Sequence, residues 1–172
     1  MNIYISQFEH DDRAFVIASN DKGVIYFGND ETTEYVDHHI RRFIQDAERV
    51  TGYPADNKND DYINDIKCYF KGQLTTFDWP LELYGTDFQK SIWEALLKIP
   101  FGESRSYSDI SEMINNPKAI RAVGGAIGAN PVMIVVPCHR VIGKSGKLTG
   151  FRGGLDMKIE LLVIEGIPYV KE

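Results

Sequence analysis

The chain has 172 residues, of which 43% are hydrophobic and 26% charged, and its net charge is −6. This composition is typical of one folded domain or two small ones, and it excludes intrinsic disorder. The apolar runs are much shorter than the roughly 20 residues of a membrane-spanning helix, and the first residues form no signal peptide, so we expect a cytoplasmic protein with no membrane partner.

Charge is divided unevenly along the chain. Residues 1–85 hold 8 Lys or Arg and 16 Asp or Glu, a net charge of −8, whereas residues 86–172 hold 11 and 9, a net charge of +2. Within residues 98–152 the net charge is +5. Because affinity for nucleic acid comes largely from lysine and arginine at the phosphates, only the second half is suited to binding DNA.

The first half predicts a small antiparallel sheet followed by helices. Short segments rich in β-branched and aromatic residues alternate with Asn, Asp and Gly turn signals, which is typical of a meander. A mixed-charge segment and a segment with apolar residues three and four apart then favour helices. The expected strands are 2–8, 14–19 and 24–27, and the expected helices are 32–47 and a segment that includes 62–70.

A domain boundary is expected near residues 83–85, where the balance of charge changes. This boundary gives an N-terminal domain of residues 1–84 and a C-terminal domain of residues 85–172.

The second half begins with helices whose first turns are marked by capping boxes. Thr86 with Gln89 and Ser106 with Asp109 have the required spacing of three residues. Pro117 predicts the start of a further helix, because proline is favoured at the first helical position. Two short helices joined by a tight turn in a basic segment predict a helix-turn-helix.

The helix expected from Pro117 to about Gly128 is nearly bare of large side chains. Each of its glycines costs about 1 kcal/mol relative to alanine in a helix interior, so another interaction must compensate. One interpretation is close approach to DNA, with Arg121 as the long side chain that enters the base stack. The other is tight packing against the protein core, and composition favours neither.

A cysteine and a histidine follow an apolar run near the C-terminus. Residues 132–136 predict a buried strand that Pro137 ends. Cys138 and His139 come next, an arrangement that suits a reactive thiol, although the pair alone is also compatible with a structural role. Cys68 is expected to be a packed, inert thiol. Because no Cys-x-x-Cys spacing occurs, we expect no structural zinc site.

Several motifs of the second half form one ordered set that covers nearly all of it. They are residues 85–89, 99–103, 106–107, 121–126, 130–131, 137–141, 150–155 and 165–166. This set resembles the O6-alkylguanine-DNA alkyltransferase family. The resemblance implies an α/β (α+β) fold, with a small ribonuclease-like N-terminal α/β domain and a mainly helical C-terminal DNA-binding domain that contains the helix-turn-helix.

The resemblance implies direct reversal of DNA damage on double-stranded DNA that contains alkylated guanine. Cys138 would take the alkyl group from guanine O6, and also from thymine O4, in a single turnover without a cofactor. His139 would accept the thiol proton through a water, and Glu165 would orient the imidazole. The protein is expected to act as a monomer.

Further roles are carried over from the same resemblance. Asn130 would tie the recognition helix to the active-site turn, Tyr107 would donate a hydrogen bond or a proton to the departing base, and Arg121 would fill the gap left by the extruded nucleotide. Arg152 stands where relatives often have a small residue, which bears on the width of the pocket. Contacts to DNA or substrate are implied for Ala122, Gly124, Ala126, Pro131, Arg140, Val141, Phe151, Arg152 and Gly153.

Two other functions use similar residues. A non-enzymatic damage sensor shares the fold but lacks the acceptor cysteine, which this chain has at position 138. A cysteine hydrolase also uses a thiol, an imidazole and a carboxylate, but it has no reason to carry a basic, glycine-rich helix. Stoichiometric alkylation of the protein is the outcome that separates the favoured function from both.

Overall fold

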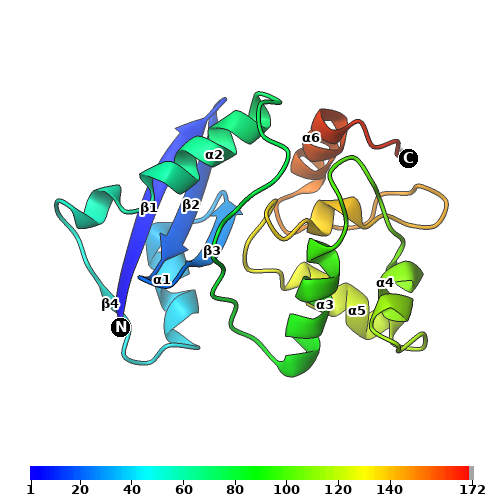
Figure 1. The fold of residues 1–172 in the computed structure, drawn as a ribbon, viewed down its shortest axis with the longest axis horizontal. Helices are drawn as coiled ribbons and strands as arrows, with labels where there is room; N and C mark the ends of the chain where they lie inside the picture. Colours follow the sequence, from blue (N-terminus) through cyan, green and yellow to red (C-terminus); the bar gives the residue numbers. More distant parts are fainter. Residues whose placement is uncertain (171–172) are drawn as a thin grey trace. The chain divides into compact units, whose positions relative to one another are not determined.

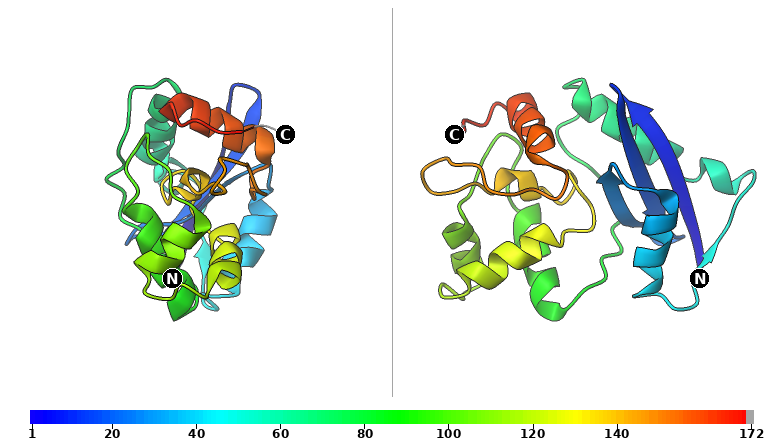
Figure 2. Two further views of the ribbon diagram at one scale, coloured as in Figure 1. Left: turned by 90° about the vertical axis from the view of Figure 1, so that its right-hand side faces the viewer. Right: turned by 180° about the vertical axis from the view of Figure 1, so that it is seen from behind.

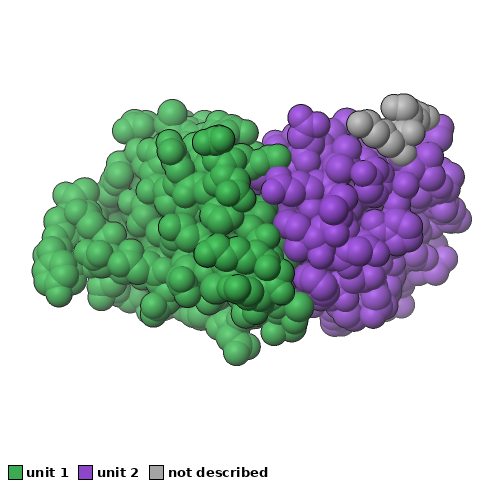
Figure 3. Space-filling model, turned by 90° about the horizontal axis from the view of Figure 1, so that it is seen from above, with its two compact units in different colours: residues 1–84 green, residues 85–172 purple. Residues whose placement is uncertain are grey.

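The computed structural model describes residues 1–170 of the chain. Two compact units, Met1–Tyr84 and Gly85–Glu172, are distinguished in Figure 3. Among residues 1–170, no helix has the length and apolar character needed to cross a membrane.

The first unit is built on a four-stranded sheet in the order β3-β2-β1-β4. Strands β1 (Asn2–His10), β2 (Arg13–Ser19) and β3 (Val24–Asn29) form an antiparallel meander, and β4 (Glu48–Arg49) pairs in parallel with β1. Both residues between β1 and β2 have positive φ, 49° and 62°, which is the geometry of a tight two-residue hairpin. The predicted meander is therefore confirmed.

Helices cover the two faces of this sheet, as Figures 1 and 2 show. Helix α1 (Thr33–Arg41) buries Val36 and Ile40 against the aliphatic face of the strands. A short 3-10 helix, η1 (Ala55–Asn57), precedes α2 (Asp60–Phe70). Helix α2 contributes to a group of packed aromatic rings that includes Phe8, Phe15, Phe27, Phe70 and Trp79.

The predicted helix over residues 32–47 is only partly correct. Helix α1 ends at Arg41, and the chain then turns so that Glu48 can pair with β1. Cys68, expected to be packed and inert, is partly buried in α2.

The second unit is mainly helical and holds α3 (Asp87–Leu97), α4 (Tyr107–Met113), α5 (Ile120–Gly128) and α6 (Leu155–Glu165). A short 3-10 helix, η2 (Cys138–Arg140), lies between α5 and α6. Helix α3 packs on α5 through the buried Trp93, whose indole Nε1 donates a hydrogen bond of 2.9 Å to the Ala126 carbonyl.

The two predicted capping boxes are both present. Thr86 and Gln89 exchange side-chain and backbone hydrogen bonds at the start of α3, and Ser106 and Asp109 do so at the start of α4. Each box satisfies backbone N–H groups that have no partner within the helix, which fixes where that helix begins.

The predicted start of the next helix at Pro117 is wrong, because α5 begins at Ile120. Asn115 adopts a left-handed conformation with φ of 58°, which ends the preceding helical turn. The Ala119 N–H then donates to the Asn116 carbonyl at 3.0 Å, which places Pro117 at the second position of a β-turn. Proline is favoured there as well as at a first helical position, so its local signal was ambiguous.

The strand predicted for residues 132–136 is also wrong, although the segment is buried as expected. The Val135 N–H bonds to the Met133 carbonyl at 2.9 Å, and the Val136 N–H bonds to the Val132 carbonyl at 3.0 Å. Ile134 has a φ of 72°, which no extended strand contains. The segment is a compact turn that leads directly into η2.

Candidate active site

Asn130 shapes the turn that precedes the cysteine. Its side-chain oxygen accepts from the Val132 N–H at 3.0 Å, and its Nδ2 donates to the Val136 carbonyl at 2.7 Å. Asn130 is 2% exposed, so both hydrogen bonds lie in the protein interior. They satisfy a backbone N–H and a backbone carbonyl that would otherwise be buried without a partner. One amide thus holds both ends of the turn and sets where η2 begins.

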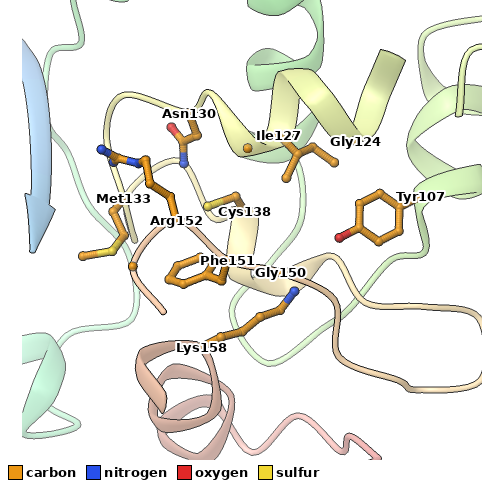
Figure 4. Close-up of a pocket in the computed structure, with 12 residues that line it drawn as sticks. Tyr107, Gly124, Ile127, Asn130, Met133, Cys138, Gly150, Phe151, Arg152 and Lys158 are labelled. Atoms are coloured by element: carbon orange, nitrogen blue, oxygen red, sulfur yellow. The ribbon is translucent and has the colours of Figure 1, made fainter. Parts of the chain in front are cut away.

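Cys138 faces a pocket formed entirely within the second unit, shown in Figure 4. The thiol is a free cysteine and its residue is 6% exposed. The pocket holds about 420 Å³ of space that no atom fills, part of it open to solvent. It is lined by Tyr107, Gly124, Ile127, Gly128, Asn130, Met133, Cys138, Gly150, Phe151, Arg152, Gly153 and Lys158.

The electrostatic environment of the thiol has two opposing parts. Burial raises the pKa of Cys138, since a charged thiolate is poorly solvated there. The Asn130 side chain and the positive charges of Arg152 and Lys158 act in the other direction and lower it. The pocket therefore keeps the resting thiol protonated while providing groups that stabilise an anion once it forms.

His139 and Glu165 form a buried pair behind the pocket. The His139 Nε2 lies 2.5 Å from the Glu165 Oε2, and both side chains are 0% exposed. Glu165 Oε1 also accepts from the Gly102 N–H at 3.1 Å. Because an ionised carboxylate can only accept hydrogen bonds, Nε2 carries the imidazole proton and Nδ1 carries the lone pair.

Arg140 completes this group from the same short helix. Its Nε donates to Glu165 Oε1 at 2.7 Å, its Nη2 to Glu165 Oε2 at 3.2 Å, and its Nη1 to the Ile99 carbonyl at 2.6 Å. The residue is 7% exposed. The guanidinium is therefore buried and bonded inside the protein, and a contact of Arg140 with DNA or substrate stays a prediction.

The free nitrogen of His139 is the second notable feature of this group. Among residues 1–170, Nδ1 of His139 is a buried side-chain atom without a hydrogen-bond partner in the protein. Burial lowers the pKa of His139, Glu165 opposes this, and the charges of Arg140 and Lys158 lower it further. The imidazole is therefore a neutral base with an available lone pair, and a buried polar atom of this kind calls for a partner.

Other predicted residues either line the pocket or are exposed. Tyr107, Gly124, Phe151, Arg152 and Gly153 line the pocket, and the Tyr107 hydroxyl is hydrogen-bonded to the hydroxyl of Thr149. Arg121 and Ala122 are exposed on the first turn of α5.

Three further predicted contact residues are buried outside the pocket lining. Val141 is fully buried and forms a β-bridge with Arg105. Ala126 is 3% exposed on the side of α5 that meets Trp93. Pro131 is buried beside Asn130. The side chains of these three residues are enclosed by the unit's own packing, and their contacts with DNA or substrate stay predictions.

Lys158 is the main pocket residue that sequence reasoning missed. It is 1% exposed, and its Nζ donates to the Val141 carbonyl at 2.8 Å. The available signal was its place in α6, where Lys158, Leu161, Leu162 and Glu165 lie three or four residues apart on the buried face. A lysine and a glutamate within an apolar stripe indicate buried charges. Ile127, Gly128, Met133 and Gly150 also line the pocket and were not predicted.

No group of three or more His, Cys, Asp or Glu side chains in the part of the chain described is placed to hold a metal ion. The chemistry of the pocket rests on one thiol, one neutral imidazole, a phenol and two cations.

Comparisons with known proteins agree on one relationship. Residues 87–167 match the sequence family described as "6-O-methylguanine DNA methyltransferase, DNA binding domain". The chain is 45% identical over 170 residues to the inducible methylated-DNA–protein-cysteine methyltransferase of Bacillus subtilis, covering 95% of this chain and 90% of that protein. It is 43% identical over 147 residues to a methyltransferase of the same name from Methanosarcina acetivorans, covering 83% of this chain and 91% of that protein.

Solved structures are similar over the whole length. The crystal structure of Mycobacterium tuberculosis O6-methylguanine methyltransferase superimposes with a TM-score of 0.79 at 38% identity, covering 95% of this chain and 92% of that one. The M. tuberculosis protein in complex with DNA superimposes with the same TM-score and identity, covering 94% and 92%.

Proposed function

The chain belongs to the methylated-DNA–protein-cysteine methyltransferase family, and from this premise we propose that it repairs DNA by moving the alkyl group from O6 of guanine onto Cys138. The observation that carries the assignment to this residue is the position of Cys138 in a pocket, next in sequence to a buried neutral imidazole whose Nδ1 has no hydrogen-bond partner within residues 1–170. We extend the proposal to O4 of alkylated thymine.

The chemical step needs no group beyond the protein, the lesion and water. The thiol proton of Cys138 passes through a water to Nδ1 of His139, which Glu165 orients through Nε2. The sulfur forms a bond to the alkyl carbon, the bond from that carbon to O6 breaks, and its electron pair leaves with the base. Tyr107, on the pocket wall, donates the proton or hydrogen bond that the departing guanine requires.

The lesion must leave the DNA duplex to react. Cys138 is 6% exposed inside a pocket, so no base within a stack can bring its O6 substituent to the sulfur. Enzymes that act on such atoms extrude the nucleotide, and unstacking costs a few kcal/mol. Phe151, Arg152 and Gly153 form the part of the pocket that receives the base in this proposal.

The reaction ends with the first turnover. A thioether sulfur is a poor leaving group, and Cys138 is the only thiol among the residues that line the pocket. We propose that the second unit carries both the DNA contact and the acceptor cysteine, and that the protein acts as a cytoplasmic monomer without a metal or a cofactor.

Incubation with a double-stranded oligonucleotide that carries radiolabelled O6-methylguanine tests this function. We expect a burst of one methyl per protein chain and no further turnover, with the label on the Cys138 peptide in mass spectrometry. Binding of the oligonucleotide without modification would instead support a damage sensor, and sustained turnover on esters or peptides would support a hydrolase.

Three glycines leave part of the surface of α5 without side chains, and this surface is suited to close contact with a partner. A Cβ atom built at Gly124, Gly125 or Gly128 has no heavy atom within 4 Å outside its own surroundings in the helix. The protein interior therefore does not require glycine at these positions, which contradicts the interpretation of tight internal packing. Close approach of a partner from outside explains the missing side chains, and we propose that this partner is DNA.

A substitution on this surface separates stability from function. Gly125→Ala is expected to raise the free energy of unfolding by about 0.5 to 1 kcal/mol, because alanine is favoured in a helix and meets no neighbour. The same change is expected to weaken binding to duplex DNA, measured by fluorescence anisotropy, and to leave reaction with free O6-benzylguanine unchanged. A destabilised variant would show that the glycine serves internal packing after all.

Arg121 is exposed at the start of α5, where it can reach a partner. If it fills the space of the extruded nucleotide, Arg121→Ala is expected to slow methyl transfer from duplex DNA by on the order of tenfold or more and to leave transfer from the free base intact. Rapid-quench measurements on both substrates decide this. Lys90→Ala on α3 is the matched loss of an exposed positive charge. Equal losses on both substrates would refute the role.

A further inference from the structure

Lys158 is a buried cation that has no carboxylate partner in the described part of the chain. Lysine is almost never fully buried unless it is paired, yet this residue is 1% exposed and its hydrogen bond goes to an uncharged group, the Val141 carbonyl, at 2.8 Å. None of the ion pairs among residues 1–170 includes Lys158. Burying a charge without a counter-charge costs free energy in the resting protein. An anion that forms near Lys158 during the reaction would offset this cost.

The pocket that Lys158 lines has no carboxylate to balance its charge. Among the residues that line it are two cations, Arg152 and Lys158, and no aspartate or glutamate. Figure 4 shows Arg152 on the same side as Asn130, and Lys158 extending from α6 on the other side, with Cys138 between them. The negative charge suited to this space is the one that forms on sulfur during the reaction.

Resting on the proposed function, we propose that Lys158 is a positioning residue for alkyl transfer, whose fixed positive charge stabilises the thiolate of Cys138. Its hydrogen bond to the Val141 carbonyl, three residues after the nucleophile, fixes where that charge lies. The thiol proton goes to His139, the new bond joins sulfur to the alkyl carbon, and the electron pair of the broken bond leaves with guanine. Lys158 keeps its protons throughout.

The effects of Lys158 and Cys138 on each other's pKa support this role. The charge of Lys158 lowers the pKa of Cys138, in opposition to burial, and Arg152 does the same from the pocket rim. Burial in turn lowers the pKa of Lys158, and the negative charge of Cys138 raises it. The other titratable groups around the sulfur are His139, which takes its proton, and the Tyr107 phenol on the pocket wall.

Lys158→Gln separates the charge from the hydrogen bond, because glutamine retains an N–H donor for the Val141 carbonyl. The measurement is a pH titration of thiolate ultraviolet absorbance in the full chain, with Cys68→Ser as background so that Cys138 is the one thiol. We expect the midpoint of the Cys138 titration to rise by roughly one pH unit or more. The reason is that the thiolate loses the attraction of one nearby positive charge in a site that is shielded from water. Single-turnover methyl transfer at neutral pH should fall by about tenfold and recover as the pH rises.

Two further variants exclude a purely structural effect. Lys158→Arg keeps the charge and should leave the midpoint near that of the parent protein, even if the rate falls. Lys90→Gln removes an exposed charge on α3 and should change neither quantity. A midpoint in Lys158→Gln equal to that of the parent, or one in Lys158→Arg as high as in Lys158→Gln, would overturn the inference. Since the titration needs no DNA, it decides the role of Lys158 separately from whether the parent protein accepts methyl.

Discussion

Replacing Cys138 by serine is expected to abolish methyl transfer, with a loss on the order of a thousandfold or more, while DNA binding persists. Serine is smaller than cysteine and fits the same space, and the backbone bond from the N–H of residue 138 to the Val136 carbonyl at 2.8 Å does not depend on the side chain. A hydroxyl, however, forms almost no alkoxide at neutral pH, and its oxygen is a much weaker nucleophile than a thiolate. Transfer of radiolabelled methyl and gel-shift titration measure the two properties.

The second cysteine provides the control for this experiment. Cys68 lies in α2 of the first unit and does not line the pocket. Cys68→Ser should accept one methyl per chain at the rate of the parent protein. Methyl transfer that survives in Cys138→Ser but disappears in Cys68→Ser would move the nucleophile to Cys68 and invalidate the proposed site.

Local signals allowed parts of the fold to be predicted accurately. The capping boxes at Thr86 and Ser106 place the helix starts correctly because the groups that satisfy each other lie within three residues. The meander of the first unit follows from alternating strand and turn signals for the same reason. Pro117 shows the limit of such signals, since proline fits both a β-turn and a first helical turn, and the conformation of Asn115 decided between them.

The strand prediction for residues 132–136 fails for a different reason. Its apolar residues correctly predict burial, but hydrophobicity alone does not distinguish a buried strand from another buried conformation. The side chain of Asn130 takes the backbone N–H and carbonyl groups at the two ends of the segment. Composition gives no sign of this use of Asn130, and only the family resemblance pointed to a role for it at the active-site turn.

Charged residues of the site were the least predictable. Arg140 lies in a basic segment, and nothing in that segment indicates that its guanidinium binds a carboxylate 25 residues further along the chain. Lys158 was not predicted at all, because lysine is usually exposed and its acceptor is a backbone carbonyl 17 residues away. Long-range partners of this kind depend on the folded packing of η2 against α6, which short motifs do not reveal.

Replacing Glu165 is expected to reduce stability strongly. Hydrogen-bond donors from three residues converge on its carboxylate, from Arg140, the Gly102 N–H and the His139 Nε2. Glu165→Gln removes the negative charge and introduces an NH2 group that has to face one of these donors. Because a buried guanidinium then lacks its counter-charge, the free energy of unfolding should fall by about 3 to 5 kcal/mol in urea titrations. Glu94→Gln, exposed on α3, is the matched control and should have little effect.

The same substitution is expected to slow methyl transfer by on the order of a hundredfold or more, because the His139 imidazole loses the negative charge that stabilises it when Nδ1 takes the proton. A double variant separates this loss from instability. Adding Arg140→Met to Glu165→Gln removes the unpaired charge and should recover part of the lost stability, as is observed when buried ion pairs are replaced by apolar groups. Activity should not recover with it, since the imidazole still lacks its carboxylate. If stability and transfer returned together, the carboxylate would matter only for folding, and the His139 relay would have to be abandoned.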